Sequence, residues 1–372
     1  MERTSDRMDA VEARPEDGGG RGSSSSQTSG TKCEVRVSGA DQCFSVPKND
    51  LLLMSAIGQG IDYPHNCRVG SCGKCKTRLV SGRISPMFDF ALSPLTNDEL
   101  KQGYILACQS KVRSDLVIDV KMGQHATLPV KTIPGRVTRW MKLPGEVIDL
   151  RLKLEEPLQF QAGQYCTIAE SGSFTRRSYS FYDAPPAPEG QGADEVGFLV
   201  KRLPGGKFSE WLFAKHREGT RMWLEGPFGT MGIDDRESDA LCVAGGTGLA
   251  PILSIVANRL AKSQTSMITI VFGVRTAADT FASERLSALL KQYAARIRLV
   301  TILSHEPATS TWSGPRGLIT EALAPNLGIA FERVAAFVCG SLPMVEAVER
   351  NLLKLGVPQD RIHADKFLPT GF

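Results

Sequence analysis

Three cysteines lie close together in the segment HNCRVGSCGKC, at positions Cys67, Cys72 and Cys75, and the next cysteine along the chain is Cys108. Four residues separate the first two, two separate the second two, and 32 separate Cys75 from Cys108. This C-x4-C-x2-C…C spacing is one at which four thiolates hold the two irons of a [2Fe–2S] cluster. The four cysteines are therefore predicted to be cluster ligands.

The residues between these cysteines favour the same interpretation. Gly70, Ser71 and Gly73 are small, so the loop can follow the cluster closely, direct its N–H groups at the sulfurs and adopt positive φ. Zinc is the main alternative because it also takes four cysteines, but zinc sites typically pair two short cysteine units. Other strand-like runs carry single cysteines, interpreted as buried structural residues: Cys33, Cys43, Cys166 and Cys242.

The whole chain has the composition of a globular protein with several domains. Its 372 residues allow two or three domains, and no apolar run approaches the ~20 residues that span a bilayer. The first thirty residues lack the apolar core of a secretory signal, so we expect a cytoplasmic protein, in which nine cysteines favour metal binding over disulfides. A net charge of +4 without a Lys/Arg block gives no reason to expect a nucleic-acid partner.

The cluster motif falls in the first of three predicted domains. Residues 1–30 are Gly/Ser-rich and lack apolar periodicity, so they are predicted to be a disordered tail. Residues 31–125 read as a compact unit, with a hairpin, a helix capped by Asn49, and a closing strand over 115–120. The stretch 123–131 is a predicted linker.

The rest of the chain changes its rhythm near residue 235. Residues 130–235 contain short strand-like segments spaced by Pro and Gly turns, with one helix after Lys207, which predicts an antiparallel barrel. Residues 236–372 alternate buried-type apolar strands with helices such as 249–262 and 342–356, which predicts a parallel α/β domain.

Residues 32–122 resemble a plant-type ferredoxin of the β-grasp fold, and about 340 of the 372 residues are similar to the iron–sulfur flavoprotein reductases that serve bacterial multicomponent oxygenases. The resemblance implies a multidomain fold, in which a β-grasp [2Fe–2S] ferredoxin is followed by an antiparallel β-barrel FAD domain and a parallel-sheet α/β NAD domain. It also implies a route from NAD(P)H to flavin to cluster to a partner protein. A flavin suits this route because it exchanges electrons both in pairs and singly.

The segment RRSYS is similar to the R-x-Y-S motif of ferredoxin-reductase barrels. Arg177 and Tyr179 point the same way along a strand, so the guanidinium can grip a flavin phosphate while the phenol lies against the isoalloxazine. Ser180 can then approach flavin N5. The alternative for this motif alone is a surface arginine beside a barrel aromatic.

A glycine turn before a helix strengthens the flavin interpretation. Gly205 and Gly206 precede a helix that begins between Lys207 and Ser209, where amide groups, the helix dipole and the Ser209 hydroxyl would hold the pyrophosphate. The order of domains, ferredoxin first, resembles the FAD branch of the family rather than the FMN branch, so FAD is the expected flavin.

The segment CVAGGTGLAP follows a buried strand and opens a helix. Gly245, Gly246 and Gly248 allow close approach to a pyrophosphate, and Thr247 adds a donor. The segment matches the family pattern G-G-T-G-x-A-P. The loop after the next strand offers Arg275 for an NADP 2′-phosphate and Asp279 for an NAD 2′-hydroxyl; family tendency favours NADH, with NADPH possible.

Two further segments gain their roles from the resemblance. In FVCGSLPMV, Cys339 is expected near nicotinamide C4, beside Gly340, although a core cysteine is the simpler interpretation of an isolated residue. In the final segment HADKFLPTGF, Phe367 is expected to cover the flavin face, with Asp365 before it and Phe372 as a competing aromatic.

The predicted partner is a terminal oxygenase or hydroxylase, of Rieske or diiron type, that accepts electrons from the cluster. Arg68, Lys74 and Lys76 surround the cluster motif, so the acceptor is expected to carry an acidic patch, although ordinary solvated charges explain them equally well. A deoxysugar dehydratase is an alternative acceptor. A redox-sensing module without turnover is an alternative of another class, but it would predict a defective nicotinamide site.

Overall fold

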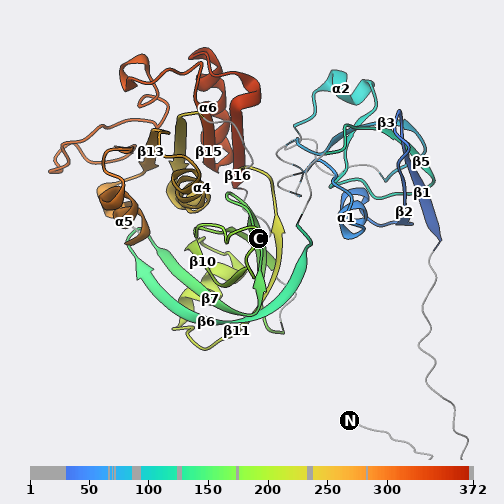
Figure 1. Ribbon diagram of the computed structural model, residues 1–372, viewed down its shortest axis with the longest axis horizontal. Helices are drawn as coiled ribbons and strands as arrows, with labels where there is room; N and C mark the ends of the chain where they lie inside the picture. The colour runs from blue at the N-terminus through green and yellow to red at the C-terminus, as the bar shows by residue number, and fades with distance from the viewer. Residues whose placement is uncertain are drawn as a thin grey trace, which may run out of the picture. The chain divides into compact units, whose positions relative to one another are not determined.

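A computed structural model describes residues 31–65, 68, 70, 73–85, 94–123, 128–172, 176–232, 238–281 and 284–367. The chain divides into residues 1–31 and residues 32–372, and the elements below belong to the second unit. The predicted tail over 1–30 lies outside the described residues. Figure 1 shows three sheets in chain order.

The first sheet has the mixed topology of a β-grasp, with strand order β2-β1-β5-β3-β4. Its strands are β1 (Lys32–Val37), β2 (Cys43–Pro47), β3 (Lys76–Ser81), β4 (Tyr104–Leu106) and β5 (Leu116–Asp119), accompanied by the helices α1 (Leu52–Gly58) and α2 (Asn97–Lys101). The predicted hairpin is confirmed, because β1 and β2 pair antiparallel. The closing strand β5 pairs parallel with β1, which brings the end of this unit back to its beginning.

The prediction that Asn49 caps the first helix is wrong. The N-cap position is Leu51, and no side chain caps the helix. Asn49 instead adopts a left-handed backbone, at φ 77°, and its side chain accepts a hydrogen bond from the guanidinium of Arg113. Asparagine tolerates this conformation better than most residues, so the turn before α1 uses Asn49 for its backbone.

The second sheet is antiparallel throughout, with strand order β10-β7-β6-β11-β8-β9. Its strands are β6 (Lys131–Leu143), β7 (Val147–Leu158), β8 (Tyr165–Glu170), β9 (Arg176–Ser180), β10 (Ala193–Lys201) and β11 (Arg221–Phe228), with helix α3 (Lys207–Ala214). Just beyond edge strand β9, the N–H of Tyr182 donates to the carbonyl of Gly197 on edge strand β10, so the curled sheet approaches closure as a barrel. Strand β11 has no counterpart in the sequence-based prediction.

The third sheet is parallel, with strand order β14-β13-β12-β15-β16. Its elements are β12 (Ala240–Gly245), α4 (Leu249–Lys262), β13 (Ile268–Val274), α5 (Glu284–Gln292), β14 (Ile297–Leu303), β15 (Ala335–Ser341), α6 (Leu342–Lys354) and β16 (Ile362–Phe367). The parallel α/β prediction is confirmed, while α5 and β16 are additions to it. In the described part of the chain, no helix is long and apolar enough to cross a membrane.

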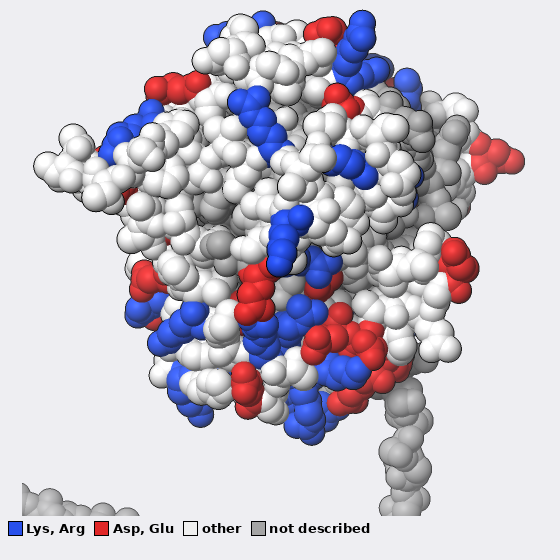
Figure 2. Space-filling view, turned by 60° about the vertical axis from the view of Figure 1, so that its left-hand side comes forward, with Lys and Arg blue, Asp and Glu red and all other residues white. Residues whose placement is uncertain are grey.

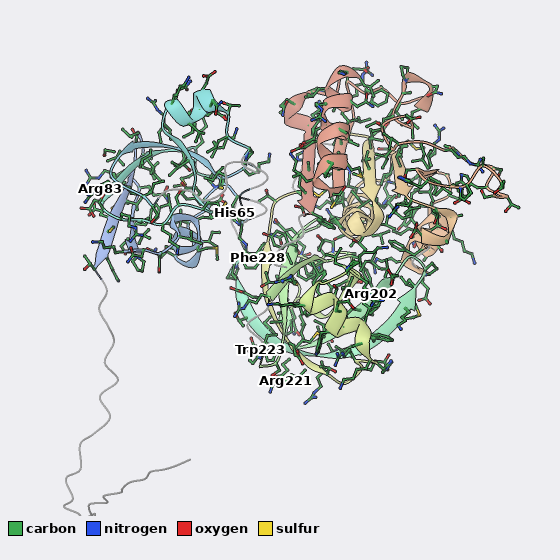
Figure 3. All side chains as sticks on the ribbon, turned by 180° about the vertical axis from the view of Figure 1, so that it is seen from behind. His65, Arg83, Arg202, Arg221, Trp223 and Phe228 are labelled. Atoms are coloured by element: carbon green, nitrogen blue, oxygen red, sulfur yellow. The ribbon has the colours of Figure 1, made fainter. Side chains whose placement is uncertain are left out.

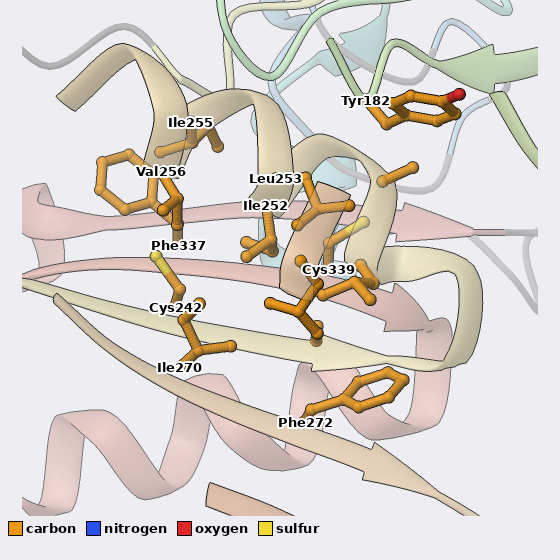
Figure 4. Close-up of a cluster of buried hydrophobic side chains, with 14 of the residues drawn as sticks. Tyr182, Cys242, Ile252, Leu253, Ile255, Val256, Ile270, Phe272, Phe337 and Cys339 are labelled. Carbon is orange, nitrogen blue, oxygen red and sulfur yellow. The ribbon is translucent and has the colours of Figure 1, made fainter. Parts of the chain in front are cut away.

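The buried side chains show which sheets share a core. The first sheet has its own cluster, drawn from residues 33–118. The cluster around α4 and β12 instead includes Val147, Tyr182 and Leu199 of the barrel, and Figure 4 shows Tyr182 at its margin. Apolar packing therefore joins the barrel to the parallel sheet and fixes the position of one against the other.

Candidate functional site

A cavity of about 780 Å³ is lined by both the barrel and the parallel α/β sheet. Strand β9 and the start of α3 line it from the barrel, and the carboxyl ends of β12, β13 and β15 line it from the parallel sheet. Twelve of the sequence-predicted site residues line it: Arg177, Tyr179, Ser180, Gly206, Ser209, Gly245, Gly246, Thr247, Arg275, Asp279, Asp365 and Phe367.

The flavin motif lies on β9, where alternation gives its residues different environments. Ser180 is 4% exposed and pairs in register with Tyr165 of β8. Tyr179 packs against Phe208 with ring centroids 5.6 Å apart, and burial raises the pKa of its phenol, which keeps the hydroxyl protonated. Arg177 donates to the carbonyl of Arg176 at 2.8 Å. Two side chains thus form an aromatic wall beside a cation, an arrangement that fits a flavin and its phosphate.

The turn before α3 is shaped by one hydroxyl. Gly206 is the N-cap of α3, and a Cβ built there would lie 2.7 Å from the Ser209 Oγ. That Oγ accepts from the N–H of Leu203 at 3.1 Å and lies 3.2 Å from the carbonyl of Gly206. Ser209 therefore fixes the turn, and the amides at the start of α3 are the groups available to a pyrophosphate. Gly205, at φ 75°, and Lys207 belong to this turn but are not among the cavity-lining residues.

The two nicotinamide motifs meet where β12 and β15 lie side by side. The strand order reverses between these neighbours, and open parallel sheets bind ligands at such a switch point. A Cβ on Gly245 would lie 2.3 Å from the Met344 Sδ, and one on Gly340 would lie 2.8 Å from the Met344 Cε. A side chain at either position would therefore require the flexible end of Met344 to shift, and Gly245 itself lines the cavity with bare backbone.

Cys339 is fully buried, and it lies among the core side chains drawn in Figure 4. It is not among the residues that line the cavity, which is reached instead by Ser341, Pro343 and Met344. Burial raises the pKa of the Cys339 thiol, and the Asp365 carboxylate raises it further, so the sulfur stays protonated. Its expected position near nicotinamide C4 stays a prediction.

The end of β16 completes the cavity. Asp365 pairs in register with Cys339, and Phe367 pairs with Ser341, so both are delivered by the edge strand of the parallel sheet. Asp365 is 5% exposed and Phe367 is partly buried. The competing aromatic, Phe372, lies outside the described residues.

The coenzyme loop after β13 places both candidate residues at the cavity. The Asp279 Oδ2 caps a short turn, accepting from the Thr276 N–H at 3.1 Å and its hydroxyl at 2.9 Å. Its Oδ1 lies 4.0 Å from the Lys201 Nζ of the barrel. Asp279 is therefore held in place with one carboxylate oxygen directed away from the turn.

The cysteine motif is described in part. The Sγ atoms of Cys75 and Cys108 lie 3.3 Å apart, and both residues are buried, at 3% and 1% exposed. Gly70 and Gly73 adopt φ of 88° and 72°, as the loop prediction required. The Gln109 Nε2 lies 3.8 Å from the Cys108 Sγ and can donate to it. Cys67 and Cys72 lie outside the described residues.

The donor set and its surroundings fit an iron–sulfur cluster. The thiols of Cys75 and Cys108 converge from distant segments, and Gly70 and Gly73, which lie between successive predicted ligands, adopt left-handed conformations. The buried Tyr63 hydroxyl is 2.5 Å from the Thr77 Oγ1, and Thr77 donates to the carbonyl of Cys75, which fixes one ligand.

Several site residues were missed by sequence reasoning. Tyr165, Lys201, Lys366 and the segment 317–320 all line the cavity. Tyr165 is set opposite Ser180 only by the register of β8 against β9. The segment 317–320 lies beyond β14 and carries no recognised motif, so no local pattern could identify it.

On the face drawn in Figure 2, the described charged side chains are of both signs. Acidic and basic side chains are interspersed over the lower part of the face in Figure 2, at the height of the barrel strands. Of the basic residues around the cluster motif, Lys76 pairs with Glu99 at 2.7 Å, and the Arg68 side chain contacts Phe228 of the barrel. Lys74 is exposed.

Family models match each of the three units. Residues 35–113 match the 2Fe-2S iron–sulfur cluster binding domain, residues 134–233 the oxidoreductase FAD-binding domain, and residues 242–350 the oxidoreductase NAD-binding domain. The chain accordingly carries sites for a [2Fe–2S] cluster, FAD and NAD(P)H.

Relatives of known role cover nearly the whole chain. The electron transfer component of xylene/toluene monooxygenase from Pseudomonas putida is 36% identical over 336 residues, 90% of this chain and 93% of the relative. The reductase component of the naphthalene 1,2-dioxygenase system from Pseudomonas putida is 33% identical over 332 residues, 88% and 96% of the two chains.

Solved structures are similar to this chain over most of its length. The ferredoxin reductase in carbazole 1,9a-dioxygenase superimposes with a TM-score of 0.72 at 27% identity, covering 91% of this chain and 99% of that one. An Amycolatopsis cytochrome P450 reductase reaches a TM-score of 0.77 at 28% identity, covering 91% and 100%. With three cofactor domains in the same order and relatives of this identity, the chain belongs to the iron–sulfur flavoprotein reductases that serve as electron-transfer components of multicomponent oxygenases.

Proposed function

We propose that this reductase oxidises NADH in the cavity lined by β9 and the ends of β12 and β15, and that its ferredoxin domain delivers electrons to a terminal oxygenase or hydroxylase. The observation that carries the proposal is that the flavin motif and both nicotinamide motifs line one cavity. When bound, FAD accepts hydride from the nicotinamide, and the [2Fe–2S] cluster passes electrons onward singly.

The chain's own residues would position the two ring systems. Tyr179 and Phe208 supply a rigid wall on the barrel side, and Ser180 stands at the end of β9 with its side chain buried. On the other side, Gly245 lines the cavity at the switch point, and the buried Gly340 packs beside it, with its Cα 3.8 Å from a Cβ built on Gly245. Phe367 lines the same cavity, and its proposed role is to cover the flavin and exclude water until nicotinamide binds.

Cys339, which does not line the cavity, would act on the bound nicotinamide indirectly, through neighbouring residues that do. Its thiol is protonated because burial and Asp365 both raise its pKa, so it would support the nicotinamide face by packing, and it would not act as a base.

Coenzyme preference is proposed from the loop after β13. Asp279 is held by Thr276 with one oxygen free of that turn, a suitable acceptor for the 2′-hydroxyl of NADH. Arg275 also lines the cavity and could instead bind a 2′-phosphate. We expect a higher kcat/KM for NADH than for NADPH, and Asp279→Ser should narrow that ratio. A wild-type preference for NADPH would reverse the assignment in favour of Arg275.

The acceptor is proposed to approach the exposed Lys74, since the side chains of Arg68 and Lys76 already contact other parts of this chain. Lys74→Glu should slow electron delivery to the oxygenase component, and the slowing should fade as salt screens the charges. Lys32→Glu is the matched control, because it makes the same charge change at the exposed start of β1. Equal effects of the two variants at low salt would show that Lys74 has no special role.

A further inference from the structure

Arg68, the residue after the predicted ligand Cys67, makes contacts that reach out of its own sheet. Its guanidinium carbon lies 3.2 Å from the ring centroid of Phe228 in β11 and 5.7 Å from that of Tyr165 in β8. Its Nε donates to the Tyr165 hydroxyl at 3.2 Å. One side chain of the cluster loop therefore stacks on one barrel aromatic and hydrogen-bonds another.

The two aromatic residues form a buried and ordered partner. Tyr165 is 4% exposed and Phe228 is 2% exposed, and their ring centroids are 5.7 Å apart. They are paired in register between β8 and β11. A cation over a desolvated ring is held more strongly than one at an exposed site, so this contact is stronger than a surface ion pair.

Arg68 is also supported from its own side. Its Nη1 lies 4.0 Å from the Met54 Sδ on α1, and its backbone adopts φ 57°, which is uncommon for a residue with a side chain. The side chain thus spans from α1 to the aromatic pair. A lysine could not replace it, because only the planar fork stacks on one ring while donating sideways to another group.

The residue that Arg68 contacts, Tyr165, belongs to the candidate flavin site. Tyr165 lines the cavity and pairs in register with Ser180, the residue expected at the flavin. Arg68 and Tyr165 therefore connect the cluster loop to the cavity.

We propose that Arg68 is a positioning residue that holds the cluster-binding loop against the Tyr165–Phe228 pair, so that the cluster stays within electron-transfer distance of the flavin. The inference rests on the proposed function, in which electrons pass from flavin to cluster. Because single-electron transfer slows steeply with distance, release of the loop would slow this step without altering hydride uptake.

The test uses the full cofactor-loaded chain. Arg68→Ala removes the stack and the hydrogen bond, and Phe228→Leu removes the ring while keeping an apolar side chain in the core. Arg83→Ala is the matched control, since it removes one exposed arginine from the same unit; Figure 3 labels Arg83, Phe228 and His65, which lies three residues before Arg68.

Anaerobic stopped-flow mixing with NADH reads flavin bleaching and cluster reduction separately. We expect flavin bleaching to match wild type in Arg68→Ala, and cluster reduction to slow at least about tenfold. Phe228→Leu should slow cluster reduction too, the double variant should be no slower than the slower single variant, and Arg83→Ala should match wild type. If Arg68→Ala fails to hold its cluster, Phe228→Leu, which lies outside the loop, decides the question alone.

Small-angle X-ray scattering without NADH provides a readout independent of turnover. Loss of the contact should increase the radius of gyration of Arg68→Ala and Phe228→Leu but not of Arg83→Ala. Unchanged scattering together with wild-type cluster reduction in both variants would overturn the proposal. A wild-type protein that bleaches its flavin with neither NADH nor NADPH would instead overturn the proposed function, while the scattering result would still decide the role of Arg68.

Discussion

Two glycines of the GGTG turn should respond very differently to the same small change. A Cβ on Gly248 would lie 2.3 Å from the Cys339 carbonyl oxygen, 2.6 Å from its carbon and 2.9 Å from the Gly340 nitrogen. A Cβ on Gly246, two residues away, would meet nothing within 4 Å. Gly248→Ala and Gly246→Ala are therefore a matched pair in one turn.

The expected loss of stability in each variant depends on whether the atoms that meet the new Cβ can shift. Overpacking a core usually costs about 1–3 kcal/mol, because side chains shift to make room. Here the obstacle is the backbone of β15, so Gly248→Ala should lower the free energy of unfolding by more than about 3 kcal/mol. Gly246 has φ 54°, where alanine costs about 1–2 kcal/mol, offset by about 0.4–1 kcal/mol from the less flexible unfolded chain. A net loss near 1 kcal/mol is expected.

The two variants should differ in NADH binding in the same way as they differ in stability. To relieve its clash, Gly248→Ala must push the turn away from β15, which separates Gly245 from Gly340 and opens the switch point. NADH affinity should fall sharply in this variant and only slightly in Gly246→Ala.

Differential scanning fluorimetry and NADH titration of the flavin-loaded protein measure both effects. At about 2–4 °C per kcal/mol for a unit of this size, the Tm should fall by about 6–12 °C or more in Gly248→Ala and by about 2–4 °C in Gly246→Ala. Similar losses in the two variants, or a larger loss in Gly246→Ala, would refute the packing argument.

Three further predictions concern the thiols and one buried carboxylate. Cys339→Ala should slow flavin bleaching by NADH with flavin and iron content unchanged, and wild-type bleaching would remove Cys339 from the mechanism. Cys108→Ser should lose the cluster but still reduce ferricyanide through the flavin, because the ferredoxin sheet has its own core; loss of both activities would show that the units do not fold independently. Asp183 is buried, accepting from Arg285 at 3.0 Å and Arg151 at 3.3 Å, and burial raises its pKa while both arginines lower it. Arg285→Gln should raise the pKa of Asp183 further, because one of the two stabilising cations is lost. The free energy of unfolding of this variant should therefore be about 1.5–3 kcal/mol below that of wild type near pH 7, and the difference should shrink as Asp183 is protonated on acidification. Urea unfolding at pH 7 and pH 4 checks this, and a deficit independent of pH would contradict it.

The sequence predicted those parts of the molecule whose information is local. The cysteine spacing, R-x-Y-S and G-G-T-G-L-A-P are contiguous motifs, and the structure brings the second and third to one cavity. The sheet types were readable from alternating and continuous apolar runs. Gly70 and Gly73 have the positive φ that a loop around a cluster demands.

The missed elements had weaker local patterns. Strand β11 contains Gly226 and Pro227 just before its last residue, Phe228, and a Gly-Pro pair reads as a turn. Strand β16 carries the charged residue Lys366, which interrupts the apolar pattern of a buried strand. Its ammonium pairs with Glu349 of α6 at 3.0 Å. Asn49 had the residue type of a helix cap, but its side chain bonds Arg113, 64 residues away.

By itself, then, the sequence determined the classes of cofactor, which are a [2Fe–2S] cluster, a flavin and a nicotinamide, and the order of the domains, because each class has a motif of residues that lie close together along the chain. Only the tertiary structure decided that Cys339 is buried outside the cavity lining, that Tyr165 pairs with Ser180, and that the Arg68 side chain stacks on Phe228. These relations depend on strand register and on packing between distant segments. No pattern of neighbouring residues encodes them, because many registers and contacts are compatible with the same local periodicity.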